Sequence, residues 1–309
     1  MQRQLPWDLV LDTYYWANKG TGLLETWNVN QMPDEYLSLG SRLNDQVPNP
    51  FYRLITSGSL NGTTVSRQQL LRPFPQYAGN NGVARVYIPA GNSTYHAVTG
   101  KIERRLSSSL TFTAQYTFSK AIDDVRTPVD LYNRRLEKSL SAFDTPHQFV
   151  FSGVYRLPFG RGRLWGGWDL NGILRLQSGQ PVTISPSGSS RTGNNNGQSA
   201  KLDNPTIDRW FNTSVFSATP ANTYPTVGPY LPDVFTDATK NIDAVIVKNF
   251  EFGVRDKKIT TQFRAEFYNL FNHPQFSAPN GTQSSQGFGT VTSQFNNPRD
   301  IQFGLKLKF

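Results

Sequence analysis

Three residues with the chemistry of an acid, a base and a nucleophile lie close together near the middle of the chain. They are Asp144, His147 and Ser152, the residue types that a hydrolase combines. In an extended segment, His147 and Ser152 differ by an odd number of positions, so their side chains point to opposite faces of a strand. A Ser–His pair across two faces cannot exchange a proton. The sequence therefore predicts a structural role for His147 and no enzymatic activity.

Metal and cofactor sites have equally little support. His96, His147 and His273 lie in separate segments, without His-x-His or His-Glu-x-x-His spacing, and the chain has no cysteine. Asp123 and Asp124 follow a predicted strand; calcium at an outer rim is one interpretation, and solvated loop charge is the favoured one. The glycine-rich stretch 160–167 follows a proline and indicates a turn. We expect no metal and no cofactor.

Composition narrows the class of protein. Of 309 residues, 17% are charged and 13% aromatic, and the formal net charge is +9. The positive residues are scattered, with no run longer than two, so nucleic acid is not expected as a partner. No apolar run approaches the roughly 18 residues of a membrane-spanning helix. The first residues also lack the apolar run of a signal peptide.

Strands must then position the functional side chains, because apolar and polar residues alternate along much of the chain. The clearest case is the last segment, where Ile301, Phe303, Leu305, Leu307 and Phe309 alternate with polar residues and glycine. Ile173, Val245, Val247 and Lys248 interrupt this alternation elsewhere. The pattern predicts eight strands, at 5–17, 94–105, 108–121, 146–157, 167–179, 241–253, 259–271 and 299–309.

The connections between these strands alternate in length. Those at 106–107, 158–166 and 254–258 are short, whereas those at 18–93, 122–145, 180–240 and 272–298 are long. All long loops would lie at one end of an up-and-down sheet, as in an outer-membrane barrel. Aromatic residues also gather near predicted strand ends, as an interfacial girdle would: Trp7, Tyr15, Trp16, Tyr155, Phe159, Trp165, Trp168 and Phe309.

In such a barrel the apolar side of each strand faces lipid and the polar side faces a wet lumen. We therefore expect eight polar residues to line the lumen: Gln115, Arg175, Gln177, Asp243, Glu251, Arg264, Glu266 and Lys306. In the stretch 201–217, which could form a short helix, Trp210 and Phe211 would contact a ligand or, as we favour, fold the loop on itself. Two alternatives remain, a self-contained eight-stranded barrel with a structural or adhesion role and a soluble extracellular β-sandwich that binds a ligand.

An ordered set of short motifs resembles the C-terminal half of TonB-dependent receptor barrels. The branch it is similar to is Oar-like, with a carboxypeptidase-regulatory-like N-terminal domain, and the resemblance runs from about residue 2 to residue 309. The motifs, in order, are Tyr116-Thr-Phe-Ser-Lys120, Phe143-Asp-Thr-Pro-His-Gln-Phe149, Leu157-Pro-Phe-Gly-Arg-Gly162, Gly179-Gln-Pro-Val182, Arg209-Trp-Phe-Asn212 and Glu266-Phe-Tyr-Asn-Leu-Phe-Asn-His-Pro274.

The resemblance implies an all-β, antiparallel, up-and-down transmembrane barrel of about 22 strands, of which this chain supplies about eight. It places the chain in the cell outer membrane, with long loops outside and the C-terminus in the periplasm. It implies binding and uptake of a ligand, driven by a TonB-type energy-coupling protein through a plug. It also implies that the barrel-assembly machinery reads Phe303, Leu305, Leu307 and Phe309 as an insertion signal.

The chain departs from the family in length, because receptors also carry a signal peptide, a TonB box and a plug. We therefore interpret residues 1–309 as the C-terminal portion of a receptor barrel, with Met1 to Leu5 ending a preceding strand that turns at Pro6. Such a portion would have two unpaired edges, which lipid does not tolerate. We expect the isolated chain to aggregate, oligomerise or fail to insert unless another piece supplies the missing strands.

Overall fold

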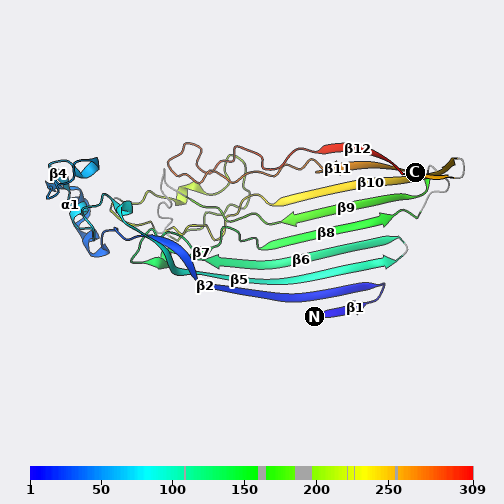
Figure 1. The fold of residues 1–309 in the computed structure, drawn as a ribbon, viewed down its shortest axis with the longest axis horizontal. Helices are drawn as coiled ribbons and strands as arrows, with labels where there is room; N and C mark the ends of the chain where they lie inside the picture. Colours follow the sequence, from blue (N-terminus) through cyan, green and yellow to red (C-terminus); the bar gives the residue numbers. More distant parts are fainter. Residues whose placement is uncertain are drawn as a thin grey trace.

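The computed structural model describes residues 1–107, 109–158, 165–184, 197–220, 222–225, 227–254 and 257–308, with side-chain surroundings for all but 105–107, 253–254 and 257–258. One long antiparallel sheet dominates these residues, and its strands follow one another in chain order (Figure 1). The strands on this path are β1 (Gln2–Leu5), β2 (Leu9–Asn28), β5 (Ala84–Ser107), β6 (Leu110–Asp123), β8 (His147–Arg156), β9 (Trp168–Gln177), β10 (Thr239–Val254), β11 (Lys257–Tyr268) and β12 (Asp300–Lys308).

All eight predicted strands are present, and Met1 to Leu5 also has the expected form, since β1 pairs with β2 through a turn at residues 6–8. The largest error concerns the loop 18–93. β2 continues to Asn28 and β5 begins at Ala84, with three register shifts between Thr21 and Trp27. This extension of the hairpin lacks regular alternation because neither of its faces has to meet a single apolar environment.

The predicted strand 259–271 ends early, at Tyr268. Asn269 and Asn272 have φ angles of 48° and 50°, and this left-handed backbone turns the chain out of the sheet. The stretch 201–217, for which a short helix was one possibility, contains a single three-residue 3₁₀ turn, at Thr213–Val215.

The remaining described elements are short and lie in the long connections. No helix among the described residues is long and apolar enough to cross a membrane. The short elements are the strands β3 (Gln46–Pro48), β4 (Thr64–Ser66) and β7 (Ser139–Leu140), the helix α1 (Arg67–Leu70), and the 3₁₀ segments Asp34–Asn44, Gly58–Leu60, Asn80–Gly82, Arg134–Glu137 and Thr213–Val215.

The main buried apolar cluster of the described residues lies in the outer loops and not under the sheet. Phe211 is fully buried, and its ring meets Phe216 and Phe288 edge-on at centroid distances of 5.9 and 5.2 Å. We call this cluster the loop core; it contains Val182, Ile184, Ala200, Phe211, Phe216, Val227, Leu231 and Val234, with Trp210, Val215 and Phe288 packed against it. Among the described residues the long strands form one sheet, and the second sheet consists only of the short strands β3 and β4, so the sandwich alternative is wrong.

Candidate functional site

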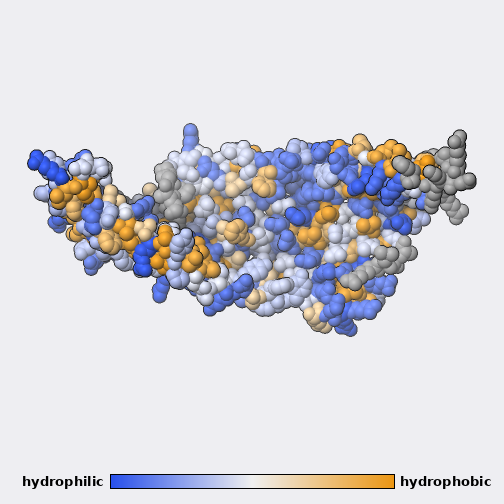
Figure 2. Space-filling model, viewed as in Figure 1, coloured by the Kyte–Doolittle hydropathy of each residue, from blue (hydrophilic) through white to orange (hydrophobic). Residues whose placement is uncertain are grey.

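The pairing register gives the sheet two chemically different faces. Residues that are direct partners in an antiparallel pair point to the same side of a sheet. One row of partners crosses six strands and is apolar throughout: Leu110, Tyr155, Leu170, Ile246, Ala265 and Phe303. We call this side the apolar face. It is unusually exposed for its chemistry, since 70% of Phe303 and 69% of Leu305 is accessible, and apolar residues gather along the edge where β12 lies (Figure 2).

The opposite side, the polar face, carries all eight residues that the sequence analysis expected to line a lumen. Arg264 and Glu266 are joined directly, with 2.6 Å between Nη2 and Oε1. The lining of a lumen stays a prediction, although the shared face is what that role requires. The register distributes the eight over five strands: Gln115 on β6, Arg175 and Gln177 on β9, Asp243 and Glu251 on β10, Arg264 and Glu266 on β11, and Lys306 on β12.

Further ion pairs and hydrogen bonds hold this face together. Lys101 pairs with Glu103 at 2.7 Å, and Arg156 pairs with Asp169 at 3.0 Å. Asp243 accepts a hydrogen bond from the backbone N–H of Asn269 at 2.9 Å, so its carboxylate holds the turn that follows β11. The polar face therefore combines both signs of charge across the sheet.

An apolar strip within the polar face was not predicted from the sequence. Val154, Ile173 and Val245 line a groove of about 430 Å³, bordered by polar groups that include Asn171 and Asp243. The signal was present, because Ile173 and Val245 are two of the residues that interrupt the alternation. The groove is a concave site lined by both apolar and polar residues, the usual composition of a small-molecule contact.

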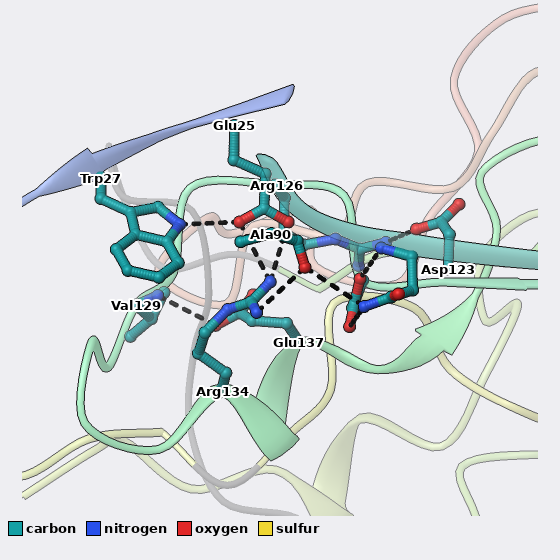
Figure 3. A network of polar contacts seen from close by, with 10 residues as sticks. Glu25, Trp27, Ala90, Asp123, Arg126, Val129, Arg134 and Glu137 are labelled. Atoms are coloured by element: carbon teal, nitrogen blue, oxygen red, sulfur yellow. Dashed lines mark hydrogen bonds and ion pairs between the residues drawn. The ribbon is translucent and has the colours of Figure 1, made fainter. Parts of the chain in front are cut away.

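A buried ion-pair network fastens the loop after β6 to the β2–β5 hairpin (Figure 3). Arg134 donates from Nη2 to both carboxylate oxygens of Glu25, at 2.9 and 3.0 Å, and from Nη1 to the carbonyl of Ala90 at 3.2 Å. The indole N–H of Trp27 donates to Glu25 at 2.7 Å, while its ring lies 5.2 Å from the Arg134 guanidinium carbon. This geometry fixes the position of the loop rather than presenting a free charge.

A second polar cluster joins three outer loops. Gln31 donates from Nε2 to Asp130 at 3.1 Å and to the hydroxyl of Tyr224 at 2.6 Å. Burial, together with the neighbouring Asp130 carboxylate, raises the pKa of Asp34 above its usual value. Burial also raises the pKa of Tyr224 to about 12. We call these residues the loop junction. They are far apart in the sequence, so no local motif marks them.

The residues proposed for hydrolysis do not form one site. His147 points to the apolar face, where its Nδ1 is 2.7 Å from the hydroxyl of Tyr116, and Ser152 points to the polar face opposite Thr113. Asp144 accepts instead from the backbone N–H of Ala121 at 2.6 Å. The absence of enzymatic activity stays a prediction.

The side chains of Asp123 and Asp124 also have different partners and do not form one site. Asp123 pairs with Arg126, whereas Asp124 accepts from the backbone N–H of Asn92 at 2.5 Å. The described residues contain no cluster of three or more acidic or histidine side chains that could hold a metal ion.

Two further sets of residues were singled out from the sequence, the aromatic pair in the stretch 201–217 and the proposed insertion signal at the C-terminus. Phe211 folds the loop on itself, as favoured, and Trp210 donates its indole N–H to the carbonyl of Phe235 at 2.8 Å. Phe303, Leu305 and Leu307 lie on the apolar face of the edge strand β12. Phe309, Phe159 and residues 160–164 lie outside the described residues.

A model of the outer membrane beta barrel domain family matches residues 1–302. The chain belongs to this family. The chain is therefore located in the outer membrane, where the apolar face is predicted to meet lipid. The predicted fold class, an all-β antiparallel up-and-down barrel sheet, is confirmed.

A solved structure has the same kind of fold. The outer membrane transporter YddB from Escherichia coli superimposes with a TM-score of 0.51 at 7% sequence identity, over 99% of this chain and 31% of that one. The outer-membrane domain thus spans about a third of the length of the transporter that it matches. No curated protein matches the chain.

Proposed function

We propose that the chain is the C-terminal portion of an Oar-like, TonB-dependent receptor barrel and takes part in ligand binding and uptake across the outer membrane. The observation that carries this proposal is the pair of unpaired edges. β1 pairs with β2 and β12 with β11, and no pairing among the described residues joins β1 to β12 (Figure 1). Such edges require further strands within a bilayer.

Three other observations support the proposal. The sheet resembles about a third of a longer outer membrane transporter. The polar face combines an apolar groove with ion pairs, which suits a lumen that contacts both protein and ligand. The motifs of TonB-dependent receptors also occur in order along the chain. The proposed partners are outer-membrane lipid, the barrel-assembly machinery, an unidentified ligand and, through a plug, a TonB-type protein.

A cross-linking experiment separates this proposal from the self-contained small barrel. The chain has no cysteine, so Gln4→Cys in β1 and Gln302→Cys in β12 introduce the only two thiols. In the outer membrane, a larger barrel keeps these edges apart and no intramolecular disulfide forms. A disulfide formed within one chain on mild oxidation would show closure of the short sheet and support the structural or adhesion alternative. Cysteines at Leu110 and Tyr155, which are paired in the sheet, provide the positive control.

Uptake tests the transport part of the proposal. Cells that carry the gene and cells that lack it are offered a panel of fluorescent oligosaccharides and peptides, with and without a proton-gradient uncoupler. We expect at least one probe to enter only with the gene and only in energised cells. Equal entry of every probe into both strains would contradict the proposal.

A further inference from the structure

The charged side chains on the apolar face all have the same sign, and ligand uptake through the barrel does not require this. Every charged side chain that the register places on this face is positive. This holds for β1, for β2 up to Thr21, for β5 from Asn92, and for the described side chains of β6 and β8–β12. The acidic residues of the same segments lie on the polar face. The positive residues are Arg3, Lys19, Arg104, Lys120, Lys240 and Lys248.

These cations form two rims at a constant separation. Lys120 stands eight residues along β6 from Phe112, the partner of Arg104, and Lys240 stands eight residues from Lys248 on β10. Lys19 likewise stands eight residues from Leu11, the partner of Arg3. Eight residues extend about 27 Å along a strand. Strand tilt shortens this distance along the membrane normal, and the long side chains extend it. The separation of the rims therefore matches the roughly 25 Å apolar band of a barrel.

The outer rim, which consists of Lys19, Lys120 and Lys240, lies toward the long loops, and all three side chains are exposed. His96 lies between two of these lysines, because it is the direct partner of Lys120 and its neighbour Thr94 is the partner of Lys19. The rim is therefore a row of cations at the level of the lipid headgroups.

Aromatic pairs lie directly beneath the outer rim, on its membrane side. The Tyr15 hydroxyl is 2.5 Å from Nδ1 of His96, and the two rings are stacked at 25°. Tyr116 and His147 repeat this arrangement with 22° between rings. These pairs set the depth of the rim, because tyrosine rings favour the boundary between the apolar layer and the headgroups.

Lys248, on the inner rim, has different surroundings. Lys248 is only 2% exposed, lies 5.7 and 5.1 Å from the ring centres of Trp168 and Phe250, and donates to the carbonyl of Gly166. The lysines of the outer rim are solvent-exposed instead. Asp144 acts electrostatically on Lys120, but its carboxylate is buried against the backbone N–H of Ala121.

We propose that the outer rim binds the phosphate groups of anionic lipids in the outer leaflet. Exposed cations of one sign, at headgroup depth and above an apolar band, are complementary to a negatively charged headgroup whose acyl chains lie along that band. Lys19 and Lys120 flank a single strand, β5, so one headgroup can contact both. The surface serves lipid selection and is independent of the ligand carried by the barrel.

The test uses the chain co-expressed with the segment that supplies the missing strands, in mixed micelles of phosphatidylglycerol and phosphatidylcholine, with retained lipid per chain measured by mass spectrometry. The variant K19Q/K120Q/K240Q is compared with K138Q/K201Q/K308Q, which removes the same charge from exposed lysines in the loops and on the polar face. We expect wild type to prefer phosphatidylglycerol and the outer-rim variant to retain at least about threefold less of it, with the control unchanged. Lysine-to-arginine substitution at the same three positions should restore retention.

Three outcomes would overturn the proposal. They are equal retention in the outer-rim variant and wild type, an equal loss in the control variant, and displacement of the lipid by inorganic phosphate as readily as by phosphatidylglycerol. The last result would indicate a site for a free anion. Single substitutions of Lys19 and of Lys120 replace the triple variant if the latter does not reach wild-type β content, and each is expected to reduce retention in part.

Discussion

Glu25 and Arg134, 109 positions apart in the chain, form a two-point ion pair in which the Glu25 side chain has no exposed surface. The pair connects the outer part of β2 to the loop that follows β6, and Trp27 closes it from one side. Because the Glu25 carboxylate is fully buried, the stability of this connection depends on its ion pair with Arg134.

Arg134→Gln should destabilise this part of the protein by about 3–5 kcal/mol, since it leaves a buried carboxylate without its cation. Equilibrium urea unfolding in micelles, with the chain co-expressed with a segment that supplies the missing strands, measures the change. Arg67→Gln is the matched control, because the Arg67–Asp45 pair at 3.3 Å is solvent-exposed and should contribute less than about 1 kcal/mol. Equal effects of the two substitutions would show that burial of Glu25 does not matter.

Leu174→Lys and Ile173→Lys should differ strongly although the residues are neighbours on β9. Leu174 points to the apolar face, two residues inside the level of Lys240, where a lysine in lipid costs about 1–2 kcal/mol, between the values at the interface and at the bilayer centre. Ile173 points to the polar face opposite Asp243, where the added ammonium gains an acidic neighbour. Unfolding in lipid vesicles measures both variants. A larger loss of stability for Ile173→Lys would show that the two faces have been assigned the wrong way round.

Phe211→Ala should cost about 3–5 kcal/mol, because it empties the centre of the loop core. Phe295, which is 75% exposed in the same outer region, provides the control, and Phe295→Ala should be nearly neutral. Amide exchange in residues 197–220 reports the loss of the core directly. Unchanged protection in Phe211→Ala would mean that backbone hydrogen bonds alone order these loops.

The loop junction should become more stable as the pH falls from neutral toward the ordinary pKa of aspartate. The folded state raises the pKa of Asp34, through burial and the Asp130 carboxylate, so it binds a proton more readily than the unfolded chain. Glu35, Arg72, Tyr132 and Tyr224 also surround this cluster, and the aromatic hydroxyls stay neutral over this range.

Asp34→Asn should remove most of that pH dependence and stabilise the junction at neutral pH. Limited proteolysis of the loop 122–146 at several pH values measures both effects. Asp144→Asn tests specificity, since the pKa of Asp144 is also raised by burial but its carboxylate lies at Ala121, outside the junction. A pH profile that is the same in Asp34→Asn and wild type would exclude Asp34 as its source.

The isolated chain should oligomerise or aggregate in micelles, because the edges β1 and β12 leave backbone groups unpaired. Size-exclusion chromatography with light scattering gives the mass of the species. Co-expression with a segment that supplies the missing strands should restore a single, heat-modifiable band. A stable monomer on its own would contradict this expectation.

The sheet could be predicted from sequence because lipid on one side and water on the other impose a strict alternation. Leu305 and Lys306 obey it, and their faces follow from parity alone. Exceptions such as Ile173 and Val245 could be seen but not interpreted, since they form the groove only after three strands pair. The loop junction was beyond prediction, because Gln31 and Tyr224 are 193 positions apart and meet only through tertiary folding.

The loop core also determines which epitopes this end of the protein presents at the cell surface. Residues 197–220 and 277–294 share backbone hydrogen bonds, with Val291 donating to Ile207 at 2.7 Å and Trp210 donating to Gly289 at 2.8 Å. An antibody or phage that docks on this end would therefore read a composite epitope drawn from two distant stretches. Neither stretch, synthesised as a free peptide, would reproduce it.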